Sequence, residues 1–320
     1  MQTIGSLCSG IGGLDIAAEQ HFGATLSWHS DIDQNANAVM AEHWPHAQGI
    51  GDFTKVDPST LPPVSVLTAG FPCQPVSVAG LKKGTADERW LFDDIHAFIQ
   101  ELPQLPKVLV LENVQGFLSN NKGATARRVV GQVVSLGYRL RWGVVRASDT
   151  GQPHQRARWF GVATTTDADS LRAGRREHSE VPSPTKASED ESGWPQRERV
   201  RDDARHGGQT VTHSDDPRRK EQRRAIAVEE KHSPTQRGSS ASWGPYSAAV
   251  ETWEELFRAP PHPLVQDRLN PRLVEWMLGY NDDWTAVVSS RVQRLKLLGN
   301  SVSPQQARLA LELLTNGSNS

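Results

Sequence analysis

The feature that most constrains the fold is an alternation of short apolar runs with amphipathic segments over residues 1–163. The runs are rich in β-branched and aromatic residues, which predicts strands at 3–7, 25–28, 65–69, 107–112, 139–146 and 158–163. Segments between them, such as 14–21 and 95–102, have helical periodicity. Because parallel strands need crossover connections, the alternation predicts an α/β fold with a doubly wound, mostly parallel sheet. Ligands of such a sheet bind at the carboxyl ends of its strands.

Residues 170–237 differ sharply in composition from the rest of the chain. Of these 68 residues 12 are apolar, about 18%, against 37% for the whole sequence. So few apolar side chains do not offset the entropy cost of ordering a segment. We predict either a solvated, disordered insert or a module that becomes ordered on a partner. Helical patterns return at 248–257, 271–278 and 304–314, with Pro304 in the first turn of the last helix and Ser301 or Ser303 as its cap.

Charge and cysteine content narrow the class of protein. The 35 Lys and Arg residues nearly balance 37 Asp and Glu residues, so any surface for a nucleic acid must be local. Two cysteines do not make a disulfide framework. No stretch approaches the roughly 18 apolar residues that span a bilayer, and the N-terminus lacks a secretory signal pattern. We therefore expect a cytoplasmic protein without a membrane segment.

A glycine-rich segment at 9–15 directly follows the first predicted strand. Gly10, Gly12 and Gly13 let the backbone turn sharply and approach a ligand with no Cβ in the way. Their spacing departs from the dinucleotide fingerprint, and the segment lacks the Gly-Lys-Ser/Thr ending of a phosphate loop. The segment is therefore either a cofactor loop or only a tight turn between a strand and a helix.

Acidic residues lie between the predicted strands at 25–28 and 65–69. Asp31 stands where a carboxylate can hold the hydroxyls of a ribose, and Asp33 is expected to cap the helix that follows. Farther along, Asp52 could accept from an adenine amino group while Phe53 offers its ring face. Together with the glycine-rich segment, these residues favour a nucleoside cofactor.

A cysteine flanked by prolines follows the apolar run 65–69, in the sequence Gly70-Phe-Pro-Cys-Gln-Pro75. A structural cysteine would lie within the strand, whereas Cys73 is expected in a loop at the carboxyl edge of the sheet. Pro72 and Pro75 fix φ, which would hold the thiol in one attack geometry. The pattern predicts a nucleophile that reacts as its thiolate; the alternative is an incidental surface thiol.

Charged residues mark the ends of two later strands. Glu112 ends an apolar strand, where partial burial would raise its pKa and let it donate a proton to a ring nitrogen near neutral pH. The alternative is an acid that stabilises a helix start. Arg156 and Arg158 hold alternate positions of an incoming strand and could address the same carboxylate, phosphate or base edge. The alternative for them is a solvated edge strand.

Taken in order, these segments resemble the motif series of the DNA cytosine-5 methyltransferases of bacteria and phages. The resemblance covers residues 1–163 and about 262–315. Its most specific parts are Pro-Cys-Gln at 72–74, Glu-Asn-Val at 112–114, Arg-Ala-Arg at 156–158 and Gly-Asn-Ser-Val at 299–302. Four independent motifs in the family's order argue against a chance match.

The resemblance implies a methyltransferase domain at 1–163, a target-recognition region at 164–262 and a segment at 263–320 that completes the first domain. It implies S-adenosylmethionine as methyl donor and double-stranded DNA as substrate, with the target cytosine flipped out of the duplex. By family analogy Cys73 attacks C6 of that cytosine and forms a covalent adduct. Glu112 then contacts N3 and the exocyclic amine, and Arg158 and Arg156 support the base and the carboxylate.

The same resemblance implies further site residues. The cofactor pocket is expected to be lined by Cys8, Gly10, Gly12, Gly13, Asp31, Ile32, Asp52, Phe53, Pro72, Asn300 and Val302. Contacts with DNA are expected from Gln74, Ser77 and Arg89, in a loop that would close over the base. Departures from the family occur at Cys8, where many members have Phe, at Ile32, where some have an aromatic residue, and at His154, where Gln is frequent. No metal site is expected.

Two other functions stay open at this point. One is a DNA-binding regulator that kept the fold but lost turnover, which Cys8, Ile32 and the apolar-poor middle region motivate. The other is a methyltransferase acting on transfer RNA through the same thiol chemistry, which the long variable insert disfavours. We expect a monomer, and the resemblance suggests a cognate restriction endonuclease as a partner.

Overall fold

The computed structural model describes residues 2–72, 91–165 and 243–315. The chain divides into two compact units, one made of Met1–Leu171 and Gly238–Ser320 and the other of Arg172–Arg237. The second unit lies outside the described residues, so every element named below belongs to the first. In the described ranges no helix has both the length and the apolar character needed to cross a membrane.

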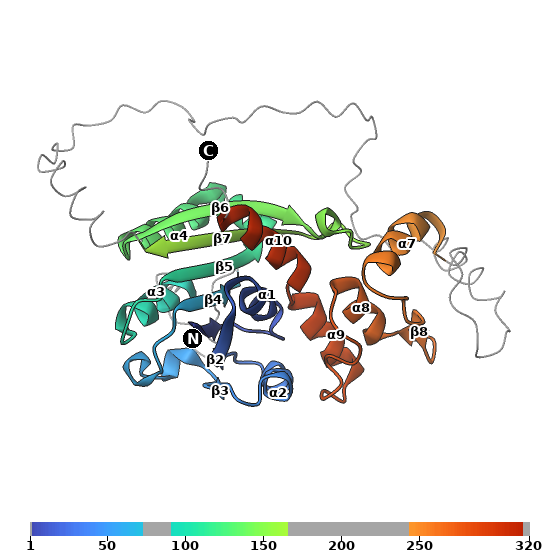
Figure 1. Cartoon of the computed structure of the whole chain (residues 1–320), viewed down its shortest axis with the longest axis horizontal. Coiled ribbons are helices and arrows are strands. Elements are labelled where there is room, and N and C mark those ends of the chain that lie inside the picture. The colour runs from blue at the N-terminus through green and yellow to red at the C-terminus, as the bar shows by residue number, and fades with distance from the viewer. Residues whose placement is uncertain (1, 73–90, 166–242, 316–320) are drawn as a thin grey trace, which may run out of the picture. The chain divides into compact units, whose positions relative to one another are not determined.

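A seven-stranded sheet in the order β3-β2-β1-β4-β5-β7-β6 forms the centre of the described part (Figure 1). Its strands are β1 (Gln2–Leu7), β2 (Ala24–Ser30), β3 (Gln48–Gly49), β4 (Val66–Gly70), β5 (Val108–Val114), β6 (Tyr138–Arg146) and β7 (Ala157–Thr165). The first five strands are parallel, and β7 runs antiparallel to both of its neighbours. The predicted α/β fold with a mostly parallel sheet is confirmed.

Helices cover both faces of the sheet. One face carries α1 (Gly13–Phe22), α2 (Gln34–His43) and α10 (Pro304–Thr315), and the other carries α3 (Leu91–Glu101) and α4 (Ala124–Ser135). Side chains of β5 alternate between the two cores: Val110 packs into the first, whereas Leu109 and Leu111 pack into the second. Burial on both faces explains why these strands are continuous apolar runs in the sequence.

The last helix completes the sheet domain although it lies far from the sheet in the sequence. α10 crosses β6 and β7 and packs beside α1 (Figure 1). Gln306 anchors α10 to β6 and to the start of β7, because its Nε2 donates to the carbonyls of Val145 and Arg156, both at 2.8 Å. Pro304 begins the helix as predicted, and Ser303 Oγ accepts from the backbone N of Gln306 at 3.4 Å.

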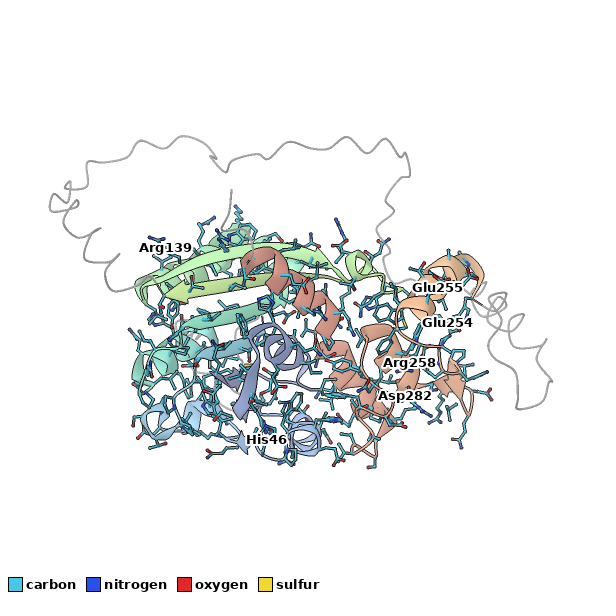
Figure 2. The ribbon with its side chains drawn as sticks, viewed as in Figure 1. His46, Arg139, Glu254, Glu255, Arg258 and Asp282 are labelled. Carbon is cyan, nitrogen blue, oxygen red and sulfur yellow. The ribbon has the colours of Figure 1, made fainter. Side chains whose placement is uncertain are left out.

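A group of small elements precedes α10. It consists of α7 (Ser247–Leu256), the hairpin β8 (Leu264–Val265) and β9 (Arg268–Leu269), α8 (Pro271–Leu278) and α9 (Arg291–Asn300). Trp253 of α7 and Trp276 of α8 share a small core, and Arg258 pairs with Asp282 at 2.8 Å (Figure 2). α9 continues through Asn300, and the chain then turns into α10 at Pro304.

Buried Glu275 organises the loop after α8. Its Oε2 accepts from the backbone N of Asp283 at 2.9 Å, and its Oε1 accepts from the backbone N of Thr285 at 3.0 Å and from Arg294 Nη2 at 2.9 Å. The loop carries two aromatic residues that reach the glycine-rich turn. Trp284 Nε1 donates to the Ile11 carbonyl at 3.0 Å, and the Tyr280 hydroxyl donates to the Val302 carbonyl at 2.7 Å. The C-terminal elements therefore help to fix the site.

Candidate active site and cofactor pocket

The candidate site is an open pocket at the carboxyl ends of β1, β4 and β5. Ligands of a mostly parallel sheet bind at this edge. The lining residues are Ser6, Leu7, Cys8, Ser9, Gly10, Ile11, Gly13, Leu14, Asp15, Gly70, Glu112, Asn300, Ser301 and Val302. The structure thus gathers in one pocket several residues that the sequence assigned to the site, although they come from both ends of the chain.

The glycine-rich turn presents backbone to this pocket. Gly10 has a φ of 56°, and a Cβ built on it would meet no atom within 4 Å, so its missing side chain leaves room for a ligand. A Cβ on Gly13 would collide with the Tyr280 hydroxyl and the Val302 carbonyl, so this glycine allows α1 to approach the C-terminal segment. Gly12 caps α1 and faces Trp44 instead of the pocket.

Asp31 follows β2 and is held beside the turn. Its Oδ2 accepts from the backbone N of Gly10 at 2.8 Å, and its Oδ1 accepts from the backbone N of Asp33 at 2.9 Å. Burial raises the pKa of Asp31, and these backbone hydrogen bonds oppose the shift. Asp33 accepts from the backbone N of Asn35, which confirms the predicted cap of α2. Ile32, between the two acids, is 78% exposed and offers an apolar surface next to Asp31.

Two predicted cofactor residues beyond β3 lie outside the pocket lining. Asp52 caps the short 3-10 helix Phe53–Lys55 and pairs with Lys55 Nζ at 2.9 Å. Phe53 is buried in the second core and meets Phe98 edge to face, with ring centroids 5.4 Å apart. Little of its ring is therefore open to a ligand in this structure.

Cys8 forms part of the pocket wall in a protonated state. Burial, followed by the charge of Asp31, raises the pKa of its thiol to about 12. Because the thiolate is the reactive form of cysteine, this side chain is a poor nucleophile at neutral pH.

Glu112 is the buried acid of the site. Its Oε1 lies 2.9 Å from Arg158 Nε, and the two side chains are 12% and 13% exposed. Burial raises the pKa of Glu112 to about 7, although the charges of Arg158 and Arg156 oppose the shift. A carboxyl group with this pKa holds a proton in a large fraction of molecules near neutral pH. Glu112 can therefore both donate and accept a hydrogen bond at a ring edge.

The register of the sheet places Glu112 beside the end of β4. Gly70 pairs with Glu112 across the β4–β5 ladder. The Oε2 atom of Glu112 lies 3.5 Å from where a Cβ of Gly70 would be. The acid thus points toward the strand end from which the chain continues to Cys73.

The two arginines approach the same carboxylate from β7. Arg158 contacts it directly, whereas Arg156, just before the strand, donates from Nη2 to the Gly299 carbonyl at 2.9 Å. Burial and the neighbouring Arg158 lower the pKa of Arg156 to about 10, so it still carries its charge at neutral pH. Nearby, burial and Arg156 lower the pKa of His154 to about 4, which keeps this imidazole neutral.

Cys73 lies outside the described residues, as do Gln74, Ser77 and Arg89, which we predicted to contact DNA. Pro72 is the last described residue before Cys73. The backbone just before it is fixed by a buried amide, because Asn113 Nδ2 donates to the Phe71 carbonyl at 2.9 Å. Asn113 Oδ1 accepts in turn from the backbone N of Val114 at 2.8 Å. Asn113 therefore ties the chain two residues before Cys73 to the strand that carries Glu112.

Three residues that support the site were not predicted from the sequence: Asp15, Tyr280 and Trp284. Asp15 lies inside the glycine-rich motif, and its only sequence signal is an acid in the first turn of a largely apolar helix. Tyr280 and Trp284 reach the turn only through the tertiary packing of the loop after α8. No local pattern could have connected them with residues 9–13.

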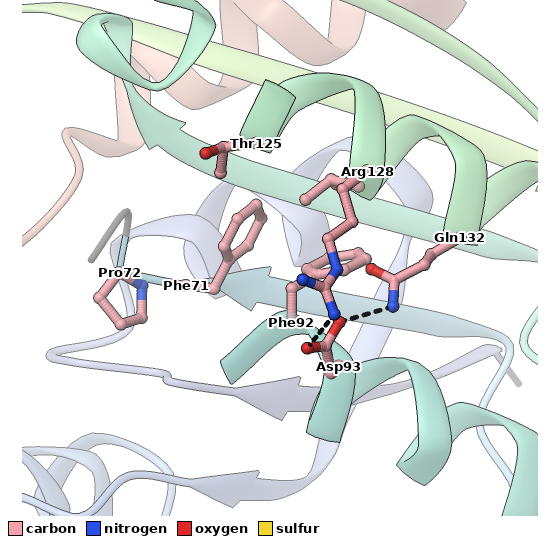
Figure 3. A pocket seen from close by; sticks show the side chains of 8 residues that line it. Phe71, Pro72, Phe92, Asp93, Thr125, Arg128 and Gln132 are labelled. Atoms are coloured by element: carbon pink, nitrogen blue, oxygen red, sulfur yellow. Dashed lines mark hydrogen bonds and ion pairs between the residues drawn. The ribbon is translucent and has the colours of Figure 1, made fainter. Parts of the chain in front are cut away.

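A second pocket lies between α3 and α4, beside Pro72 (Figure 3). Its apolar lining residues are Phe71, Pro72, Phe92 and Val129. The carboxylate of Asp93 in its wall already has two hydrogen-bond donors. Asp93 accepts from Arg128 Nη2 at 2.7 Å and from Gln132 Nε2 at 2.8 Å. This pocket lacks the exposed backbone of the glycine-rich turn and is a weaker candidate for a polar ligand. In neither pocket, nor elsewhere in the described ranges, do three or more His, Cys, Asp or Glu side chains gather as a potential metal site.

Comparison with known proteins gives a match over almost the whole chain. The model of the family described as C-5 cytosine-specific DNA methylase matches residues 2–314. The chain is 37% identical over 158 residues to the type II methyltransferase M.NlaX of Neisseria lactamica, a match that covers 49% of this chain and 50% of that protein. It is 35% identical over 162 residues to the type II methyltransferase M.HhaI of Haemophilus parahaemolyticus, covering 50% and 48%. The chain spans about half the length of the curated relatives it matches.

Solved structures resemble the chain over its full length at low identity. The Dnmt2 methyltransferase of S. pombe has a TM-score of 0.57 and 18% identity, with 100% of both chains covered. A putative DNA modification methyltransferase encoded within a prophage of E. coli has a TM-score of 0.57 and 19% identity, again with 100% of both chains covered. At these identities the likeness concerns the fold.

Proposed function

Since the chain belongs to the family of C-5 cytosine-specific DNA methylases, we propose that it transfers a methyl group from S-adenosylmethionine to C5 of a cytosine in a specific DNA sequence. The observation that carries the proposal is the position of Glu112. It is a buried acid paired with Arg158, it lines the same pocket as the glycine-rich turn, and it faces the end of the strand that leads to Cys73.

The proposed reaction needs both a nucleophile and an acid because C5 of an aromatic pyrimidine does not attack a methyl donor. The Cys73 thiolate adds to C6 while Glu112 protonates N3, and the displaced electron pair makes a nucleophilic enamine at C5. S-adenosylmethionine would supply the electrophilic methyl group and leave as S-adenosylhomocysteine. Loss of the C5 proton to a base, return of the N3 proton to Glu112 and cleavage of the C6–S bond then restore the aromatic ring and release Cys73. Since stacking hides C5 and C6, the base must leave the duplex first.

The pocket fits the proposed methyl donor. Gly10 leaves open space over the turn, and Asp31 is held next to it as an acceptor for ribose hydroxyls. Ile32 offers an apolar surface for the adenine, with Asp52 and Phe53 farther along the same edge of the sheet. The remaining proposed contacts are Cys8, Gly13, Pro72, Asn300 and Val302, whereas Gly12 faces Trp44.

The arginines are proposed to act through the carboxylate and the C-terminal segment. Arg158 orients Glu112 and limits the rise of its pKa, so that both the protonated and the ionised form of Glu112 are populated near neutral pH. Arg156 links the start of β7 to the Gly299 carbonyl and so positions Asn300 at the pocket. Both cations also favour an electron-rich base edge next to Glu112.

Substrate recognition and partners extend the proposal. We assign methyl transfer to residues 1–163 completed by 263–320, and the reading of the DNA sequence to 164–262, with contacts from Gln74, Ser77 and Arg89. The family's description supports DNA as the substrate, and we propose that it is double-stranded. We propose a monomer that works on DNA in the cytoplasm, with a cognate restriction endonuclease as a functional partner.

The direct test offers purified full-length chain and S-adenosylmethionine labelled in its methyl group to duplex DNA and, separately, to transfer RNA. We expect label in DNA alone, and bisulfite sequencing of DNA from expressing cells should place 5-methylcytosine at one short sequence. Label in transfer RNA alone would show that the substrate is RNA and not DNA. Binding of donor and DNA without any transfer would contradict the proposal and favour a DNA-binding regulator.

Asn113→Asp is expected to slow methyl transfer by about 10- to 100-fold while leaving the affinity for S-adenosylhomocysteine unchanged. The substitution keeps the acceptor of the Val114 N–H but removes the donor to the Phe71 carbonyl, and a buried unpaired carbonyl or a displacement near 1 Å costs catalysis this much. Single-turnover rates and calorimetric titration measure the two quantities. A variant with the wild-type rate would show that Asn113 does not position the Cys73 loop.

A further inference from the structure

Asp15 is a fully buried acid at the cofactor pocket with an unused oxygen. It is the third residue of α1, is 0% exposed and lines the pocket. Its Oδ1 accepts from Thr68 Oγ1 of β4 at 2.6 Å. Its Oδ2 is buried and has no hydrogen-bond partner among the described residues. Because buried polar atoms are nearly always hydrogen-bonded, this oxygen calls for a partner.

The neighbouring acids already have partners. Asp31 accepts from two backbone N–H groups, and Glu112 is paired with Arg158. Burial raises the pKa of Asp15 to about 6, while the nearby hydroxyls of Thr68 and Ser6 oppose the shift. A cation placed next to Asp15 would offset the cost of burying its charge, as ion pairing does for buried carboxylates in general.

The order of strands indicates which part of the proposed methyl donor would lie nearest to Asp15. Asp31, which follows β2 and is held beside Gly10, suits the ribose, whereas β4 and β5 lead to Cys73 and Glu112. Asp15 lies between these two groups, bridging α1 to β4 next to β1. A donor whose adenosine occupies β3 and β2 therefore places its sulfonium and amino-acid end over β1 and β4. That end carries the α-ammonium, a strong hydrogen-bond donor.

We infer that Asp15 Oδ2 accepts a hydrogen bond from the α-ammonium of the methyl donor and is the counter-charge of its amino-acid end. The inference rests on the proposed function, since it concerns the donor of that reaction. It assigns a binding role to a residue that otherwise serves only as a link between α1 and Thr68. It also explains why a carboxylate is kept in a buried position where an amide would satisfy Thr68 equally well.

The test varies the ligand and the protein together. Calorimetry measures the Kd of S-adenosylhomocysteine and of its analogue without the amino group, for the wild type and for Asp15→Asn. We expect the wild type to bind the analogue about 10- to 100-fold more weakly, the effect of one charge-assisted hydrogen bond. Asp15→Asn should lose a similar factor for S-adenosylhomocysteine and should bind the two ligands nearly equally. The Asp57→Asn variant, which changes a fully exposed acid, is the matched control and should keep the wild-type preference.

The outcomes separate this inference from the proposed function. Equal binding of both ligands by the wild type, or an undiminished preference in Asp15→Asn, overturns the role of Asp15 even if the protein methylates DNA. A wild type that binds neither ligand overturns the proposed donor and the inference with it. Since the ionised carboxylate is costly to bury, the unliganded Asp15→Asn protein should melt no lower than the wild type at pH 8. If the Asp15→Asn protein does not fold, the comparison of the two ligands on the wild type still tests whether the amino group contributes to binding.

Discussion

Cys73→Ser is expected to abolish methyl transfer to DNA, with a fall in kcat of at least about 10⁴-fold. A thiol near its ordinary pKa of about 8.5 supplies some thiolate at neutral pH, whereas a serine hydroxyl supplies almost no alkoxide. Without addition at C6, the C5 carbon stays unreactive, and Glu112 has no developing charge to stabilise. Transfer of labelled methyl under single-turnover conditions measures the loss.

The chain has one other cysteine, which provides the control for that prediction. The Cys8 thiol is held protonated by burial and Asp31, so Cys8→Ser should still support the covalent step even if donor affinity changes. Binding of S-adenosylhomocysteine by Cys73→Ser should equal that of the wild type. A Cys73→Ser protein that methylates at a rate within tenfold of the wild type would remove Cys73 as the nucleophile.

Glu112→Gln is expected to lower kcat by about 10²- to 10⁴-fold while donor affinity is retained, because the amide can hydrogen-bond N3 but cannot protonate it. Glu312→Gln is the matched control, since it changes a partly exposed acid of α10 paired only with Arg308 in the described part of the chain. Steady-state rates on duplex DNA test the difference. A Glu112→Gln enzyme within threefold of the wild type would show that proton donation by this residue is not needed.

The pH profile gives a second readout for Glu112. Its pKa is raised from 4.5 to about 7, so its protonated fraction falls as pH rises through about 7. The thiolate form of a cysteine with the ordinary pKa of about 8.5 increases over the same range, and the two trends offset each other up to that pH. Above that pH only the loss from Glu112 remains, so the wild-type rate should fall at alkaline pH. Glu112→Gln should lack this alkaline fall.

The sequence predicts the sheet and the strand ends well because each signal is local. Strands buried on both faces read as apolar runs, and the helix cap at Asp33 and the first turn at Pro304 follow from residue type alone. Glu112 could be identified as a desolvated acid because it ends such a run, and the structure raises its pKa as expected. These features depend on neighbours within a few residues.

What the sequence could not predict depends on contacts between distant segments. α9 was missed because it carries two arginines, a lysine and a glutamine, and only Leu297 and Leu298 of it are buried. Trp284 donates to the Ile11 carbonyl from 273 positions away, and the Tyr280 hydroxyl lies against Gly13 of the same turn. Phe53, predicted to face an adenine, is drawn into the core by Phe98, which no local pattern reveals.

The most direct measurement of the central claim is covalent trapping. DNA in which 5-fluorocytosine replaces cytosine throughout is incubated with the protein and S-adenosylmethionine, and the protein is digested for mass spectrometry. Because fluorine cannot leave C5 as a cation, the C6–S bond cannot be cleaved and the adduct persists. The account predicts a methylated fluorocytosine nucleotide on the peptide that contains Cys73. An adduct on any other residue, or no adduct from protein that binds both donor and DNA, would contradict it.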